Sequence, residues 1–440
     1  MSRVRPASIR AVWQGRAPNC SSSGSVVGAA ILTLGGVGAL LHLLAARLSR
    51  PRTGDEEPLL LRKEADGAVV FVPESGDKVH LDAEGAKALA ADAAPWGEGE
   101  AVPGALSAPT EVHVSLGETC GLRCTACYIG AGPDRAPSAL PPASFYAELA
   151  QMGVFEVALG GGERGFDAAL FSAIADARRA GLRVNLTTSG LGLSAVAAAR
   201  LAGEVGQVNI SLDGLGPIYA AVRGFDGSAM GISALHTLRA AGVKTGVNTV
   251  LSRALLERPG ALQALGAAIA EAGAEEWQWL RMKPSGRGRA AWSAVSPPPE
   301  ALDGLLPRLL AAEAATGLRI RVDCALLPFV VDALEPAQAA AMGLRGCPGG
   351  QSLLTRSADG GLSPCSFVAS SPADSVAAAW SNDATLLRWR GRAAAPPEPC
   401  AACPHQAVCR GGCRAVAEAL TGDALAPDPQ CPRVRAHARG

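Results

Sequence analysis

The stretch Cys120-Gly121-Leu122-Arg123-Cys124-Thr125-Ala126-Cys127-Tyr128 guides the interpretation of the whole chain. It places three thiols on one short segment, directly after an alternating run, 111–116, that predicts a strand. Three cysteines can ligate three irons of a [4Fe–4S] cube and leave the fourth iron open, whereas such clusters normally take four cysteinates. An open metal position can hold a substrate or cofactor. A zinc knuckle short of one ligand and three core cysteines are the alternatives, and Arg123 and the flanking glycines favour an exposed loop over a core.

Length, charge and cysteine content limit the possible classes. The 440 residues predict two folded units with a sizeable core. The 40 basic and 40 acidic residues balance, so we expect no nucleic-acid partner. Of 12 cysteines, 11 follow residue 119 in spaced groups typical of metal ligation. Disulfides are the alternative, but the chain is large and no secretory cleavage site follows its apolar segment, which favours a reducing compartment, the cytoplasm.

The N-terminal region 1–52 contains an apolar segment, 26–46, with arginines on both sides. Its 21 residues are enough to span a bilayer. The cysteine-rich part must face the cytoplasm to meet reductants, so the arginine-rich N-terminus would have to cross the membrane, against the positive-inside tendency. Two interpretations stay open, an N-terminal membrane anchor and a misassigned upstream start. Cys20, in this region, matches no motif.

Residues 53–105 predict a small unit of short strands at 59–61, 68–72 and 78–81, with a turn at 73–77. A helix follows at 82–92, with Asp82 as its possible cap. A β-hairpin that packs on the next domain is one interpretation of this unit.

Residues 106–318 alternate strand and helix patterns. Strands are expected at 112–117, 154–160, 183–188, 207–212, 244–250 and 276–282. Helices are expected near 142–152, 167–180, 194–204, 228–241, 260–273 and 299–315. Such alternation predicts parallel strands with crossover helices, here an α/β fold with a partial (β/α)6 TIM-like barrel. Reactive groups in such folds lie at the C-terminal ends of the strands.

Polar and glycine motifs follow several of these strands. They are Gly160-Gly161-Gly162-Glu163, Thr187-Thr188-Ser189-Gly190, Ser211-Leu212-Asp213-Gly214 and Asn248. Glycines allow close backbone approach, and Glu163 can accept bonds from an ammonium group; a helix-capping turn is the alternative. Arg223 pairs with a carboxylate or is a surface charge. The basic loop 281–289 holds an anionic substrate group or is solvated.

The region 319–440 carries the remaining cysteines. A strand is expected at 319–322, and a hairpin between Cys347 and Cys365 with its turn at 359–361. The full set is Cys324, Cys347, Cys365, Cys400, Cys403, Cys409, Cys413 and Cys431. A zinc ribbon explains two CxxC-like pairs but not the whole spacing.

The Cys120 motif and the cysteines from Cys347 onward resemble the radical S-adenosylmethionine (SAM) superfamily with a C-terminal SPASM domain, over residues 111–435. The resemblance implies a SAM-binding [4Fe–4S] cluster on Cys120, Cys124 and Cys127. SAM would bind the open iron and be reductively cleaved to a 5′-deoxyadenosyl radical, which abstracts hydrogen from a substrate. The implied SAM contacts are Tyr128, Gly161, Gly162, Glu163, Ser189, Ser211, Asp213 and Asn248. Arg164 stands where relatives usually have proline, and Ser189 where they often have asparagine.

The resemblance also implies two auxiliary [4Fe–4S] clusters in the SPASM domain. Cys347, Cys365 and Cys413 would hold the first, with Cys324 as its fourth ligand or with an open site instead. Cys400, Cys403, Cys409 and Cys431 would hold the second. Residues 59–92 resemble the start of a peptide-recognition module, which is the second interpretation of that unit.

The implied function is a radical SAM oxidoreductase, a peptide maturase that modifies a ribosomally made peptide with flavodoxin or ferredoxin as reductant. The alternatives are modification of a cofactor or haem precursor and a non-catalytic Fe–S electron carrier. A zinc-binding interaction protein is a third hypothesis. Ser366 follows Cys365 where sulfatase-maturing relatives carry aspartate, which disfavours a sulfatase substrate.

Overall fold

The computed structural model describes residues 57–90, 93–98, 100–336, 339 and 344–439. Region 1–52, with its apolar segment 26–46 and Cys20, lies outside the described residues. Within the described part, no helix is both long enough and apolar enough to cross a membrane.

A small four-stranded sheet begins the described chain. Its elements are β1 (Leu59–Glu64), β2 (Gly67–Val72), β3 (Asp77–Asp82), α3 (Ala83–Leu89) and β4 (Ala93–Glu98). The strand order is β3-β2-β1-β4. The Asp82 side chain accepts the Gly85 amide at 2.9 Å, so the expected hairpin and helix cap are both present. Strand β4 was not expected, because Pro95 and Gly97 interrupt its pattern.

This small sheet is fastened to the base of the larger domain. Arg62, fully buried, donates to the carbonyl oxygens of Ala108, Pro109 and Gly153 at 2.8–2.9 Å. Phe71 stacks on Phe155 with ring centroids 5.1 Å apart. The unit therefore packs on the next domain, as its hairpin interpretation requires.

The main sheet has nine strands in the linear order β11-β10-β9-β8-β7-β6-β5-β12-β13. Its parallel strands are β5 (Glu111–Ser115), β6 (Glu156–Gly160), β7 (Arg183–Thr188), β8 (Gln207–Ser211), β9 (Thr245–Val250), β10 (Glu276–Leu280) and β11 (Arg319–Val322). β12 (Leu353–Arg356) adds in parallel beside β5, and β13 (Leu362–Ser363) pairs antiparallel with β12. The six expected parallel strands are present, and β11 extends them to seven because it pairs in parallel with β10.

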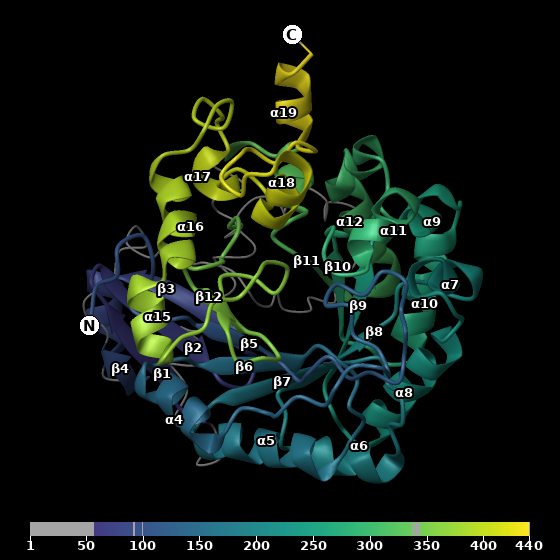
Figure 1. Ribbon diagram of the computed structural model, residues 1–440, viewed down its shortest axis with the longest axis horizontal. Coiled ribbons are helices and arrows are strands. Elements are labelled where there is room, and N and C mark those ends of the chain that lie inside the picture. Colours follow the sequence, from purple (N-terminus) through teal and green to yellow (C-terminus); the bar gives the residue numbers. More distant parts are fainter. Residues whose placement is uncertain (1–56, 91–92, 99, 337–338, 340–343, 440) are drawn as a thin grey trace, which may run out of the picture.

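The crossover helices cover the outer side of this sheet (Figure 1). The expected ones are α4 (Ala143–Gln151), α5 (Ala168–Arg179), α6 (Ala195–Leu201), α8 (Ser228–Ala240), α10 (Ala261–Glu271) and α12 (Leu305–Thr316). Helices α7 (Pro217–Arg223), α9 (Arg253–Glu257) and α11 (Gly288–Val295) lie within segments expected to be loops, and Pro299–Leu302, expected in the last helix, form a separate 3₁₀ turn. Val112 and Val157 face the helices and are fully buried, whereas His113 and Ala158 face the opposite side and line a cavity.

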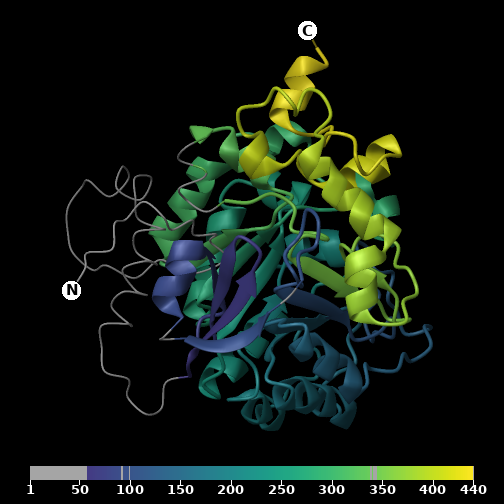
Figure 2. The ribbon, with the colours of Figure 1, turned by 90° about the vertical axis from the view of Figure 1, so that its left-hand side faces the viewer.

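The C-terminal segment lies across the side of the sheet away from α5 and α6 (Figures 1 and 2). Its helices are α13 (Leu327–Val331), α15 (Val376–Asn382), α16 (Ala384–Ala394), α17 (Gln406–Cys409), α18 (Arg414–Thr421) and α19 (Pro432–His437). β12 returns from this segment to the edge of the core sheet, and the expected hairpin between Cys347 and Cys365 is formed by β12 and β13. The cysteines of the C-terminal segment are thereby brought over the carboxyl ends of the core strands.

Candidate active site

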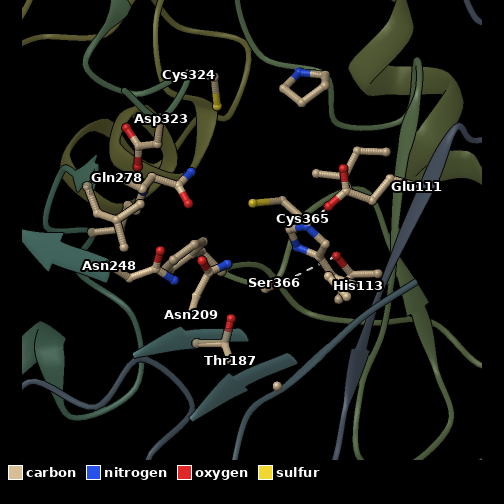
Figure 3. A pocket seen from close by; sticks show the side chains of 18 of the residues that line it. Glu111, His113, Thr187, Asn209, Asn248, Gln278, Asp323, Cys324, Cys365 and Ser366 are labelled. Carbon is tan, nitrogen blue, oxygen red and sulfur yellow. Dashed lines mark hydrogen bonds and ion pairs between the residues drawn. The ribbon is translucent and has the colours of Figure 1, made fainter. Parts of the chain in front are cut away.

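One cavity of about 1530 Å³ occupies the space enclosed by the sheet and the C-terminal segment. Side chains from β5 to β12 line it, together with seven of the cysteines. Figure 3 shows the Cys324 and Cys365 sulfurs on the C-terminal side, facing the carboxamides of Asn209, Asn248 and Gln278. The chemistry-bearing groups of distant sequence segments therefore share one enclosed space.

The Cys120 loop contributes three thiols, of Cys120, Cys124 and Cys127, to the cavity wall. Burial raises the pKa of the Cys124 thiol, Arg223 opposes that rise, and Cys127 and Cys120 add to it. The amide of Leu122 donates to Cys120 Sγ at 3.4 Å. N–H donors aimed at sulfur stabilise thiolates, so this donor set fits the three-thiolate ligation that a [4Fe–4S] cluster with an open iron requires.

Arg223 lies between a carboxylate and the cysteine loop. Its Nε donates to Asp213 Oδ2 at 2.5 Å, and its Nη1 lies 3.8 Å from Cys124 Sγ. The second Asp213 oxygen accepts the Val250 amide at 2.8 Å, and the Asp213 side chain is 2% exposed. Both Asp213 oxygens are thus engaged by protein groups, and Asp213 positions Arg223 beside Cys124. Of the two interpretations of Arg223, the carboxylate pair is correct.

The loop after β10 holds the cysteine loop from the other side. Ser285 Oγ donates to the Tyr128 carbonyl at 2.9 Å, and Arg287 Nε donates to the Cys124 carbonyl at 2.9 Å. Gly286 has φ +54°, and a Cβ there would lie 2.5 Å from the Tyr128 oxygen and 2.6 Å from the Cys127 oxygen. Only glycine allows this approach.

Two further basic groups of this loop, Arg281 and Lys283, are buried in ion pairs, whereas Arg289 is exposed. Arg281 binds Asp428 through two N–H···O bonds of 2.5 and 3.1 Å. Lys283 pairs with Asp323. Both interpretations of these two basic residues are therefore wrong, because the loop serves to join β10 to the C-terminal segment.

The turn after β6 packs against the segment before Cys120. A Cβ on Gly162 would lie 2.5 Å from the Thr119 oxygen and 2.6 Å from the Gly117 oxygen. Glu163 accepts bonds of 2.6 Å from Thr188 Oγ1, Ser189 N and Ser189 Oγ. A carboxylate offers about four lone-pair positions, so Glu163 keeps capacity for one further donor at the cavity wall.

Arg164 is accommodated at the position after Glu163. It donates to the Ser138 carbonyl at 3.2 Å and pairs with Asp167 at 3.3 Å, and Asp167 in turn caps α5. The turn is therefore held by side-chain bonds.

A row of polar side chains crosses three neighbouring strands inside the cavity. Asn248 on β9 lies directly opposite Ser211 on β8 and Gln278 on β10. All three line the cavity, and the buried Asn248 Oδ1 accepts no hydrogen bond from the described residues. Asn248 and Ser211 were expected as SAM contacts, and their side chains face the cavity, where they can form hydrogen bonds with a bound ligand.

Four C-terminal cysteines form a first group on the cavity wall, Cys324, Cys347, Cys365 and Cys413. The interaction between the Cys324 and Cys347 thiols raises the pKa of Cys324 and lowers the pKa of Cys347. Burial raises the pKa of Cys365 to about 12, and Cys347 and Cys413 add to that rise. Cys324 therefore lies within this group despite its distance in sequence.

The remaining four cysteines form a second group outside the cavity lining. Burial raises the pKa of Cys409 to about 12 and that of Cys400 to about 11, and Cys431 adds to both. Cys403 adds to the burial-driven rise at Cys431. All eleven cysteines of the described chain are free thiols. Within the described ranges, no three His, Cys, Asp or Glu side chains converge as ligands of a single ion do.

Two features of the site were missed by sequence reasoning. The Tyr128 ring packs against the Phe367 ring at a tilt of 42°, with centroids 5.0 Å apart, and this contact links the cysteine loop to the first C-terminal group. At the opposite end of the cavity, Lys78 from β3 pairs with Glu156 and Glu111. Neither contact has a local sequence signal, because each joins segments more than 30 residues apart.

Comparisons with known proteins agree with this geometry. The family model of the radical SAM superfamily matches residues 114–254. The chain is 30% identical over 344 residues to the mycofactocin maturase MftC of Mycobacterium ulcerans, a match that covers 74% of this chain and 88% of that protein. It is 28% identical over 339 residues to the PqqA peptide cyclase of Methylocella silvestris, covering 73% and 87%.

A solved structure shares the fold. Streptococcus suis SuiB bound to the precursor peptide SuiA superposes with a TM-score of 0.66 at 15% identity, covering 85% of this chain and 98% of SuiB. The parallel sheet, the three-thiol loop at its carboxyl edge and the similarity to MftC lead to one conclusion: the chain belongs to the radical SAM superfamily and is an enzyme of that family.

Proposed function

We propose that this radical SAM enzyme modifies a ribosomally made peptide. The observation that carries the proposal is a cavity of about 1530 Å³ that is lined both by the Cys120 loop and by the first C-terminal cysteine group. This volume exceeds that of a typical small-molecule pocket, about 300–1,000 Å³. The name of the PqqA peptide cyclase supports the peptide class.

We assign Cys120, Cys124 and Cys127 to the SAM-binding cluster. When bound, this cluster supplies the electron that cleaves SAM reductively to the 5′-deoxyadenosyl radical. The chain's own residues would bind and orient the cofactor. Glu163, Ser211 and Asn248 offer hydrogen-bonding groups at the cavity wall, and Gly161 and Gly162 allow close backbone approach. Arg223, held by Asp213, would stabilise the Cys124 thiolate.

We assign the two C-terminal groups to two auxiliary [4Fe–4S] clusters of a SPASM domain. Grouping of the eight cysteines into two sets of four supports this assignment. The position of Cys324 on the cavity wall with Cys347, Cys365 and Cys413 favours Cys324 as the fourth ligand of the first cluster over an open site. Because β11 belongs to the core sheet, we place the start of the SPASM domain after Val322.

A low-potential donor, flavodoxin or ferredoxin, would supply the electrons. The free thiols favour a reducing compartment, which we take to be the cytoplasm. The small sheet at 59–98 would be a shortened peptide-recognition element, since its hairpin is held against the base of the cavity.

The experiment that tests the peptide class uses short peptides encoded beside the gene. Each peptide is incubated anaerobically with the reconstituted full-length enzyme, SAM and dithionite, and its mass is then measured. A mass change that requires Cys124 is expected, and Cys20→Ala is the matched cysteine control. SAM cleavage without any peptide mass change, but with turnover of a haem or cofactor precursor, would contradict the peptide substrate.

A further inference from the structure

A buried arginine without partners lies beside the first C-terminal cysteine group. The Arg414 side chain is 0% exposed and lines the cavity. None of its three guanidinium nitrogens has a hydrogen-bond partner among the described residues. Arg414 is also the first residue of α18, where the positive end of the helix dipole disfavours a cation. A buried charge in this state is strongly unfavourable unless an anion accompanies it.

The charges around Arg414 indicate where that anion belongs. Arg414 directly follows Cys413 in the chain, and its side chain lines the same cavity as Cys324, Cys347 and Cys365. The guanidinium carbon lies 5.2 Å from the centre of the Trp389 ring, which fixes one face of the group. The groups beside Arg414 that can carry negative charge are therefore the thiols of the first group.

The other cations near this group differ from Arg414 in having partners. Arg392 donates to the Gly411 carbonyl, and Arg410 donates to Gln351 Oε1. Lys283 is paired with Asp323, and Arg281 is paired with Asp428. Their charges are already balanced within the protein. Among the described residues, no carboxylate forms an ion pair with Arg414. Its charge and its N–H groups can therefore interact with a cluster that the thiols ligate.

We propose that Arg414 is the counter-cation of the first auxiliary cluster, donating N–H groups to its sulfurs and raising its reduction potential. This inference rests on the assignment of that cluster to Cys324, Cys347, Cys365 and Cys413 in the proposed function. Reduction adds one electron from an external donor to the cluster, with no bond formed or broken. A fixed positive charge stabilises the more negative reduced form, and hydrogen bonds to the sulfurs act in the same direction.

The test is a potentiometric titration followed by electron paramagnetic resonance. The full-length chain carries Cys120→Ala, Cys124→Ala and Cys127→Ala, so that only the auxiliary clusters give signals. Arg414→Met removes the charge with little loss of volume, Arg414→Lys keeps the charge without the planar fork, and Arg388→Met is the control. Arg388 is exposed and pairs at the surface with Asp423.

The expected result is that Arg414→Met lowers one of the two midpoint potentials and leaves the other in place. The ratio of reduced to oxidised cluster at a fixed potential should fall at least tenfold, which is about 59 mV for one electron. Arg414→Lys should recover most of this shift. If neither midpoint moves further than in Arg388→Met, the proposal is overturned.

The iron content distinguishes a failure of the role proposed for Arg414 from a failure of the auxiliary-cluster assignment. Two auxiliary clusters correspond to about eight irons per chain. If the arginine-containing parent binds no auxiliary iron, the proposed clusters and the role of Arg414 both fail. If Arg414→Met loses about half of that iron while Arg414→Lys retains it, the charge holds the cluster and the proposal stands. Loss in both variants overturns it, because lysine keeps the charge.

Discussion

Asp428 joins the C-terminal segment to the core, and its removal should strongly destabilise the protein. It is fully buried, binds Arg281 through both carboxylate oxygens, and accepts the Cys413 amide at 3.1 Å. Its own carbonyl accepts the Cys431 amide at 3.1 Å. One residue therefore fixes the backbone beside both C-terminal cysteine groups and ties it to the end of β10.

Asp428→Ala leaves the Arg281 guanidinium, 2% exposed, without its carboxylate. Breaking a buried pair from one side costs about 3–5 kcal/mol, because an uncompensated charge remains buried. At about 2 °C per kcal/mol for a large domain, the thermal midpoint of the anaerobically reconstituted protein should fall by at least about 6 °C. Iron bound per chain should fall as well, since the Cys413 amide loses its acceptor.

The control is Asp423→Ala, five residues earlier, which removes an exposed pair with Arg388 worth about 0–1 kcal/mol. The double change Arg281→Met with Asp428→Leu should recover most of the thermal midpoint, because no charge is left unpaired. If Asp428→Ala shifts the midpoint no more than Asp423→Ala does, the buried pair does not join the two parts of the molecule as argued.

Three further changes test other contacts. Gly286→Ala should reduce the iron bound at the SAM-site cluster, because its Cβ would overlap the Cys127 and Tyr128 carbonyls. The control Gly242→Ala, at φ +73° with open space around it, should bind normal iron. Equal iron in both variants would refute the close contact between Gly286 and the cysteine loop. Asp213→Asn should lower 5′-deoxyadenosine formation roughly tenfold by releasing Arg223, while the exposed Asp226→Asn leaves it unchanged; an unchanged rate in Asp213→Asn contradicts the positioning role. Lys78→Met removes the cation between Glu156 and Glu111. Glu156 keeps its pair with Arg183, so the cost should be about 3 kcal/mol, the low end for breaking a buried pair from one side. The exposed Lys87→Met should cost little in the same thermal unfolding measurement, and equal midpoints would contradict the buried pair.

The sequence predicted the elements that rest on local periodicity. The six core strands alternate or are wholly apolar, and the six crossover helices between them carry apolar faces. Elements set by tertiary contact were not predicted. β4 contains Pro95 and Gly97 and forms only because β1 offers a parallel partner. β11 was expected in the C-terminal domain, yet pairing with β10 places it in the core sheet.

The cysteines could be found from their spacing, and the charged residues that position them could not. Arg223, Arg281 and Lys283 looked alike in sequence as basic residues near strand ends. Their roles depend on which carboxylate the fold brings close, Asp213, Asp428 or Asp323. No sequence pattern predicted a role for Lys78 or Arg414, because the role of each depends on its burial in the folded protein.

The most direct test of the central claim is formation of 5′-deoxyadenosine. The full-length enzyme is reconstituted anaerobically, supplied with SAM and dithionite, with and without peptide, and the nucleoside is quantified. The account predicts a product that disappears in Cys124→Ala and persists in Cys20→Ala. A protein with its clusters intact that forms no 5′-deoxyadenosine even with its candidate peptide present, or forms it equally well without Cys124, would contradict the account.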